Sequence, residues 1–300
     1  MPPAQEPRMN FDLLFQQAVT LLAAGDLPAL DRLLTDHPEL ARQPLTTPAP
    51  WLREKIGNAL DGFFKNPYLL WFIAEDVPVL GTLPPNIPDL ARTILLHAQG
   101  SPDLQHQLDT TFRLVCWSVP ARNADHQLEL LDLLLTAGAS TGGSLDNALV
   151  NANIQAAQHL ADHGVPLTLS SALCLNRWED ATKLVSSADS DAKQFALVLA
   201  ALNGNHAAVQ WNLHHGADPN LPSKNLYSHG TPLHHAVCSG SLPAVRTLLD
   251  AGANPHTRDT AWNGTPLGWS EHYLSERKDP ASQKTYTEIA SCLRDALRST

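Results

Sequence analysis

The sequence predicts an all-α fold in which short helix pairs stack side by side as a solenoid. Apolar residues recur at helical spacing in short segments along most of the chain, and glycines separate many of these segments. The phrase Gly-Thr-Pro-Leu occurs twice, at residues 230–233 and 264–267. Because a short helix pair cannot bury its apolar face alone, each pair needs a neighbouring pair to cover it.

The most complete helix pair lies within residues 230–255. Thr231 can cap its first helix, and Pro232 suits the first helical position because the N–H that proline lacks has no partner there. Gly240 ends the first helix and Gly252 ends the second. The predicted core face of the second helix carries Val245, Leu248 and Leu249. We therefore expect the substitution Leu249→Ala to cost about 2–5 kcal/mol of stability.

This helix pair resembles an ankyrin repeat, and His234 lies where the Thr-Pro-Leu-His motif of that family carries a structural histidine. The resemblance is detailed over residues 195–270, looser over 126–194 and 10–40, and slight over 41–110. It implies an ankyrin-repeat solenoid of about seven repeats. The irregularity of the early repeats is similar to that of divergent ankyrin proteins of bacteria.

The resemblance divides the chain into four parts. Residues 1–9 form a Pro-rich, disordered lead, and residues 10–40 form an N-terminal capping repeat. A divergent helical region rich in aromatic residues spans 41–105, and residues 106–300 hold ankyrin repeats with a C-terminal cap. The main expected helices are 10–24, 51–64, 68–75, 89–98, 111–119, 126–136, 144–151, 153–162, 169–176, 179–186, 194–203, 206–214 and 286–297.

Composition narrows the class of partner. The 300 residues include 30 acidic and 20 basic side chains, which gives a formal net charge of −10. Binding to nucleic acid or to an anionic membrane depends on Lys and Arg contacts, so neither partner is expected. A partner protein with a basic surface suits this charge. Widely spaced cysteines, no signal-peptide pattern and no membrane-length apolar run predict a cytoplasmic protein, which we expect to be a monomer.

The sequence holds no recognisable catalytic motif, so we expect a non-catalytic protein without a cofactor. Among the 14 histidines, His159 and His163 stand four residues apart on one expected helix, which can place two imidazoles side by side. A zinc site needs further ligands, and the sequence offers no His-Glu-x-x-His or Cys-x-x-Cys pattern to supply them. No metal is therefore expected. The sequence leaves open whether a single cysteine acts as a nucleophile.

An aromatic cluster at residues 51–72 has two interpretations. Its members are Trp51, Phe63, Phe64, Tyr68, Trp71 and Phe72. Such clusters are usually core, and a divergent repeat with a bulky core explains this one. The alternative is a small-molecule or metal-binding protein, or an enzyme, with its site in this region or at a histidine cluster.

The resemblance also implies where a partner protein binds. Ankyrin proteins generally use the tips of their finger loops and the exposed side of their first helices, which line a concave groove. When the ankyrin motif is aligned with this sequence, these positions are Tyr227, Ser228, His229, Trp262, Asn263, Asn203, Ser239, His272 and Tyr273. Aromatic side chains are enriched at binding hot spots. For Trp262 and Tyr273 the alternative is that they cover the end of the core, and Trp269 is expected to be core.

Overall fold

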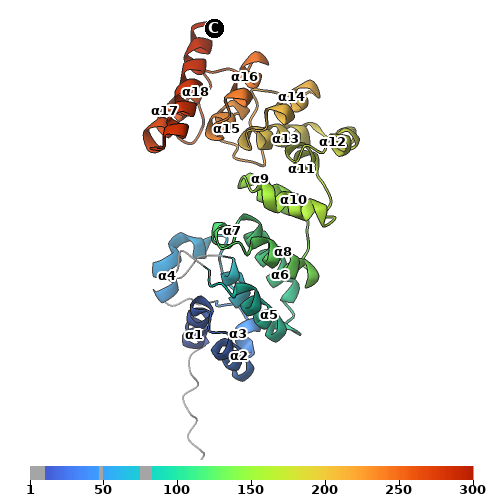
Figure 1. Cartoon of the computed structure of the whole chain (residues 1–300), viewed down its shortest axis with the longest axis vertical. Helices are drawn as coiled ribbons and strands as arrows, with labels where there is room; N and C mark the ends of the chain where they lie inside the picture. Colours follow the sequence, from blue (N-terminus) through green and yellow to red (C-terminus); the bar gives the residue numbers. More distant parts are fainter. Residues whose placement is uncertain (1–10, 47–49, 75–82, 300) are drawn as a thin grey trace, which may run out of the picture. The chain divides into compact units, whose positions relative to one another are not determined.

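A computed structural model describes residues 11–46, 50–74 and 83–299 (Figure 1). The expected disordered lead lies outside these residues. The described chain is mostly helical and contains no strand, so the prediction of an all-α solenoid is confirmed. Two compact units, Met1–Ser144 and Leu145–Thr300, divide the chain. The division into four parts stays a prediction.

The described residues of unit 1 form three helix pairs. Helix α1 (Phe11–Ala24) packs on α2 (Leu27–Asp36), the 3₁₀ helix η2 (Leu69–Ile73) on α5 (Ile87–Ala98), and α6 (Leu104–Trp117) on α8 (Gln127–Thr136). The second members α2, α5 and α8 pack in sequence, as do α1, η2 and α6. The same unit also contains shorter elements, namely α3 (Glu39–Arg42), α4 (Pro50–Ile56), η1 (Gly57–Asp61) and α7 (Val119–Asn123).

Several helix boundaries in unit 1 differ from the expected ones. The helix expected at 51–64 is split into α4 and η1, because Gly57 adopts a φ of +49°, which does not continue an α-helix. The segment expected at 68–75 is only a short 3₁₀ helix whose residues are all buried, so it has no amphipathic period. Helix α6 begins seven residues before the expected Thr111. Its buried face is partly polar, which hid the helical period: Gln107 and Thr111 are both fully buried, and the Thr111 hydroxyl donates to the Gln107 carbonyl at 2.7 Å.

The aromatic cluster is largely the core of unit 1. Phe64 lies edge-to-face with Trp71 and Phe72, with ring centroids 5.6 and 5.2 Å apart. Phe72 in turn contacts Phe15 of α1, and all four rings are buried. Tyr68 is buried too and donates its hydroxyl to Asp103 at 3.0 Å. The packing therefore supports the interpretation of these side chains as core.

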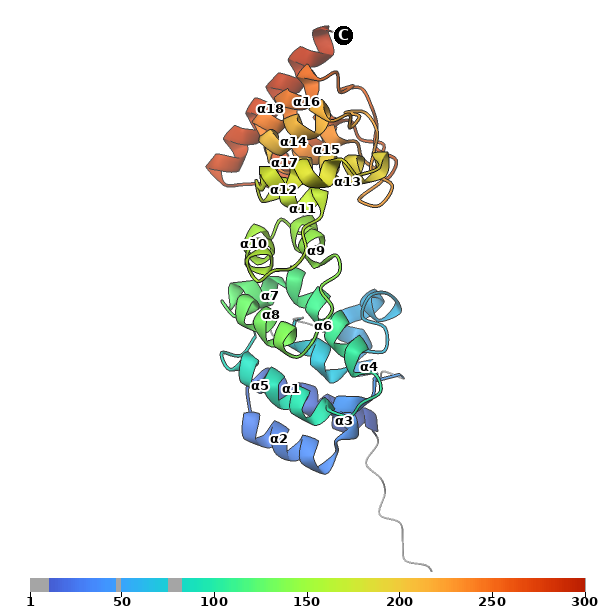
Figure 2. The same ribbon diagram turned by 90° about the vertical axis from the view of Figure 1, so that its right-hand side faces the viewer.

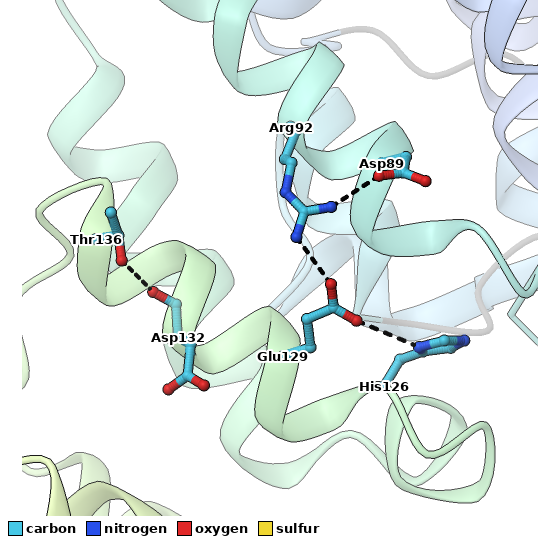
Figure 3. A network of polar contacts seen from close by, with 6 residues as sticks. All are labelled: Asp89, Arg92, His126, Glu129, Asp132 and Thr136. Atoms are coloured by element: carbon cyan, nitrogen blue, oxygen red, sulfur yellow. Dashed lines mark hydrogen bonds and ion pairs between the residues drawn. The ribbon is translucent and has the colours of Figure 1, made fainter.

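Polar contacts on the surface of unit 1 link α5 to α8 (Figure 3). Arg92 on α5 donates to Asp89 on its own helix at 2.7 Å and to Glu129 on α8 at 2.8 Å. The Nδ1 atom of His126 lies 3.8 Å from the second carboxylate oxygen of Glu129. Arg92 thus joins the second helices of two successive pairs.

Unit 2 contains five helix pairs in chain order. They are α9 (Ser144–Val150) with α10 (Ile154–Asp162), α11 (Leu169–Cys174) with α12 (Trp178–Val185), α13 (Ser190–Leu202) with α14 (His206–His214), α15 (Pro232–Cys238) with α16 (Leu242–Asp250), and α17 (Pro266–Glu276) with α18 (Pro280–Ser299). The first helices α11, α13, α15 and α17 pack in a row, and the second helices α14, α16 and α18 form another (Figure 2). Helix α18 begins six residues before the expected Tyr286, because Asp279 caps it by accepting from Ser282 N at 2.8 Å.

The turns within the pairs explain why the sequence folds this way. Gly204 adopts a φ of +65°, and a Cβ there would lie 3.0 Å from the side chain of Ser241 in the next repeat, so glycine is required. The Ser241 hydroxyl donates to the Gly204 carbonyl at 2.9 Å and accepts from Ala244 N at the start of α16. One serine therefore caps its own helix and fixes it to the preceding turn.

The core of α16 differs in one detail from the expected face. Val245 and Leu248 are fully buried, whereas Leu249 is only half-buried. We therefore expect the large loss of stability for truncation of Leu248, whose side chain lies inside the stack, and a smaller loss for truncation of Leu249. Periodicity alone placed both leucines on one broad apolar face and did not separate its centre from its edge.

Candidate partner-binding site on unit 2

A cavity of about 620 Å³ opens in unit 2 beside two finger loops, residues 221–230 and residues 256–264. The 221–230 finger precedes α15, and the 256–264 finger precedes α17. The C-terminal ends of α9, α13 and α15 contribute Val150, Leu202 and Cys238 to its lining. The other lining residues are Tyr227, His229, His235, Trp262, Gly264, Gly268, Trp269, His272 and Tyr273.

Asp259 holds the 256–264 finger in shape. Its Oδ1 accepts from the backbone N–H of Ala261 at 2.8 Å and of Trp262 at 2.6 Å. Its Oδ2 accepts from Gly264 N at 2.8 Å and from the indole Nε1–H of Trp269 at 2.9 Å. Burial by itself would raise the pKa of this carboxyl, but the four donors outweigh it and lower the pKa to about 2. Asp259 is therefore ionised at neutral pH.

The 221–230 finger is held in an unfavourable backbone conformation at its aromatic residue. Tyr227 has a φ of +42°, a region that bulky side chains rarely adopt. A turn fixes this geometry, since Gly230 N donates to the Tyr227 carbonyl at 3.2 Å. The two fingers are joined by a bond of 2.9 Å from Thr260 N to the His229 carbonyl. Strained residues of this kind are concentrated at functional sites.

The adjacent histidines of α15 have different surroundings. The Nδ1 atom of His234 accepts from Thr231 N at 3.2 Å, and its Nε2 donates to the Gly264 carbonyl at 3.2 Å, so this ring links α15 to the next finger. These contacts fit the expected structural role of His234. His235 is 2% exposed and lines the cavity. Burial lowers the pKa of His235 to about 4, so the ring is neutral at physiological pH.

The aromatic rings around the cavity form one connected cluster. Trp262 lies 5.0 Å from His229 at an interplanar angle of 84°, and 5.7 Å from Trp269 at 66°. Tyr227 lies 6.0 Å from the ring of His235. At the far side Tyr273 stacks on Tyr286, with centroids 5.2 Å apart, and its hydroxyl contacts Cys238 Sγ at 3.1 Å. Rings at such different angles bound the cavity in several directions.

Two of these rings are exposed in spite of their packing. The residue Trp262 is 70% exposed, and the residue Tyr227 is 47% exposed. Tryptophan is enriched at binding hot spots, so the exposure of Trp262 favours the partner-binding interpretation over the one in which this residue covers the end of the core. Trp269, expected to be core, is half-buried and lines the cavity.

The structure gathers five of the nine predicted site residues around the cavity, namely Tyr227, His229, Trp262, His272 and Tyr273. Ser228 and Asn263 are exposed on the fingers beside it. Asn203 and Ser239 are used within the stack. The Asn203 amide donates to the Leu149 carbonyl at 3.0 Å, and the Ser239 hydroxyl donates to the Ala236 carbonyl at 2.8 Å.

The motif count that gives Asn203 and Ser239 also gives the residues directly before them, Leu202 and Cys238, and these two line the cavity in place of their neighbours. Sequence reasoning missed other residues of the lining. His235 and Trp269 lie inside helices, where no local signal separates a core side chain from one that borders a cavity. Val150 comes from α9, far away in sequence.

The fold also shows the surroundings of other groups that the sequence analysis considered for chemistry. The rings of His159 and His163 lie 4.2 Å apart, and His163 Nδ1 contacts the His159 carbonyl at 2.8 Å, which ties it to the end of its own helix. Cys116 and Cys174 are buried, and burial raises the pKa of both thiols, that of Cys116 to about 12. Neither thiol is therefore a nucleophile at neutral pH.

Comparison with known proteins finds a family that matches part of this chain. Residues 169–259 match the family of ankyrin repeats, in three copies. The prediction of an ankyrin repeat protein is confirmed. Ankyrin repeats are in general protein–protein interaction modules. None of the described helices is long and apolar enough to cross a membrane.

Two relatives are similar to parts of this chain. The B-cell lymphoma 3 protein homolog of Mus musculus is 29% identical over 181 residues, which is 60% of this chain and 36% of the mouse protein. An ankyrin repeat protein of Pyrobaculum aerophilum is 38% identical over 91 residues, or 30% of this chain and 32% of that protein. The matched regions thus span about a third of the length of either relative.

Proposed function

We propose that this protein is a non-catalytic scaffold that binds a partner protein through the cavity and the two fingers of unit 2. The observation that carries the proposal is the position of Trp262 and Tyr227, both exposed at finger tips and both lining one cavity. A few residues carry most of the binding energy in many interfaces, and Trp and Tyr are enriched among them. Ser228 and Asn263 stand beside them as polar contacts at the rim.

The rigidity of the fingers supports the same proposal. Asp259 fixes the loop of Trp262 through four hydrogen bonds, and Tyr227 is held by its turn and by the link between the fingers. A preformed site loses little conformational entropy when a partner binds. We place this activity in the cytoplasm and expect a monomeric scaffold, whose net charge of −10 favours a basic partner surface.

The test is affinity capture from a native lysate, read by mass spectrometry. The double variant Tyr227→Ala/Trp262→Ala should lose a partner that the wild-type protein retains, while the far-UV circular dichroism of both proteins is the same. Trp178→Ala is the matched control, because Trp178 is an exposed tryptophan on α12 outside the cavity lining. If the double variant captures the partner as well as the wild-type protein does, the cavity is not the binding site.

A further inference from the structure

We propose that the cavity of unit 2 receives an arginine side chain of the partner protein, whose guanidinium lies among the aromatic rings. The inference rests on the proposed function, since it names the chemistry of the group that docks at the same site. Three features carry it: the kind of side chain in the walls, the charge around them and the hydrogen bonds that already occupy the nearby carboxylate of Asp259.

The first feature is that aromatic rings dominate the lining. Four Trp and Tyr residues and three histidines line the cavity, and among the described lining residues only Val150 and Leu202 are aliphatic. A pocket for a leucine or isoleucine anchor needs aliphatic walls, whereas the faces of Trp and Tyr carry negative electrostatic potential. Rings that meet at 66° to 88°, as Trp269 does with Trp262 and His235, surround a guest from several sides. A cation within about 6 Å of such rings is attracted to them.

The second feature is the charge around the cavity. None of the described lining residues is a lysine or an arginine. His235 stays neutral because it is buried. Behind the wall Asp259 is ionised and accepts the indole N–H of Trp269, which polarises that ring and makes its face more negative. The cation on the same finger, Arg258, donates to the Asn263 carbonyl at 2.6 Å and is not part of the lining.

The third feature favours arginine over lysine. Both oxygens of Asp259 are already committed to four N–H donors, so this carboxylate is not available to a guest. A lysine ammonium is strongly hydrated and needs acceptors to replace its water. A guanidinium is weakly hydrated, is planar and stacks on aromatic faces, so it loses less on entering such walls. The acidic chain adds attraction to a basic partner segment.

The experiment uses the full-length protein labelled with 5-fluorotryptophan and observed by fluorine NMR, with Trp262→Phe and Trp269→Phe to assign two resonances. The probes are four tripeptides, acetyl-Gly-X-Gly-amide, in which X is arginine, citrulline, lysine or leucine. Citrulline is the matched control, because it keeps the shape of arginine and removes the charge. The arginine peptide should shift the resonances of Trp262 and Trp269, with a Kd about tenfold lower than that of the citrulline peptide. The variant Tyr227→Ala should weaken this binding, and Trp178→Ala should leave it unchanged.

Four results would overturn the inference, and each is distinguishable from failure of the proposed function. Equal binding of the arginine and citrulline peptides would exclude a role for charge. Tighter binding of the leucine peptide would make the cavity an apolar pocket, and tighter binding of the lysine peptide would assign it to an ammonium. If no peptide shifts either resonance while lysate capture still depends on Tyr227 and Trp262, the scaffold function stands and the arginine assignment falls.

Discussion

The indole Nε1–H of Trp269 donates a hydrogen bond of 2.9 Å to Oδ2 of Asp259, ten residues earlier in the chain. This bond fastens the 256–264 finger to helix α17, because the same carboxylate also accepts from three backbone N–H groups of the finger. A single buried carboxylate thus sets the position of Trp262 relative to the cavity. The shape of the site depends on this carboxylate as much as on the aromatic residues themselves.

The first prediction concerns that carboxylate. Asp259→Asn keeps the size of the side chain, but its amide nitrogen cannot accept the bonds that one carboxylate oxygen accepts. We expect a loss of about 2–4 kcal/mol in the free energy of unfolding, because hydrogen bonds to a charged group are lost and N–H donors are left unpaired. Urea unfolding followed by tryptophan fluorescence measures it. The exposed Asp250→Asn should change the midpoint little, and an equally small change in Asp259→Asn would contradict the structure.

The second prediction concerns pH and His235. The pKa of this ring falls from 6.5 to about 4 on folding, so below pH 6.5 the unfolded chain takes up a proton that the folded chain does not. The free energy of unfolding should therefore have its highest value above pH 6.5 and decrease by up to about 3 kcal/mol as the pH falls to 4. His234, whose pKa is also lowered by burial, acts in the same direction.

The control for the pH effect is His235→Gln, which cannot titrate. Denaturant unfolding measured at intervals from pH 7.5 to 4 should give a flatter dependence in this variant than in the wild-type protein, with His234 accounting for part of what is left. Parallel curves for the two proteins would show that His235 is not held neutral in the fold.

The third prediction separates two neighbouring leucines of α16. Leu248 is fully buried, so Leu248→Ala should cost about 2–5 kcal/mol by leaving a cavity in the stack. Leu249 is half-buried, and Leu249→Ala should cost clearly less. Unfolding midpoints of the two variants, measured in urea, compare them directly. The opposite order would mean that the face of α16 is rotated from the one described.

The fourth prediction concerns the contact between α5 and α8 in unit 1 (Figure 3). Arg92 and Glu129 are about half exposed, so their attraction is screened by water and salt. A double-mutant cycle of Arg92→Met and Glu129→Gln should give a coupling of less than about 1 kcal/mol, which decreases further at high salt. A coupling well above this range would show that the pair is shielded from solvent.

Much of the fold could be predicted because its signals are local. The phrase Thr231-Pro-Leu and the glycines at 204, 240 and 252 specify where helices begin and end, and each acts within a few residues. Where local signals were misleading, the predicted helix boundaries were wrong. The buried face of α6 is partly polar, so its apolar pattern begins after its first turns, and the cap Asp279 of α18 lies well before the apolar residues of that helix.

The candidate site could be predicted only in part. By itself the sequence determined the helix pairs and the finger residues Tyr227, His229 and Trp262, since motif positions fix where a finger lies. Only the tertiary structure decided that His235 and Trp269 border the same cavity and that Asp259 supports it. The reason is physical: caps and turns depend on neighbouring residues, whereas a cavity depends on how successive repeats stack. That stacking also decides whether an apolar side chain of a helix is buried in the core or lines the cavity.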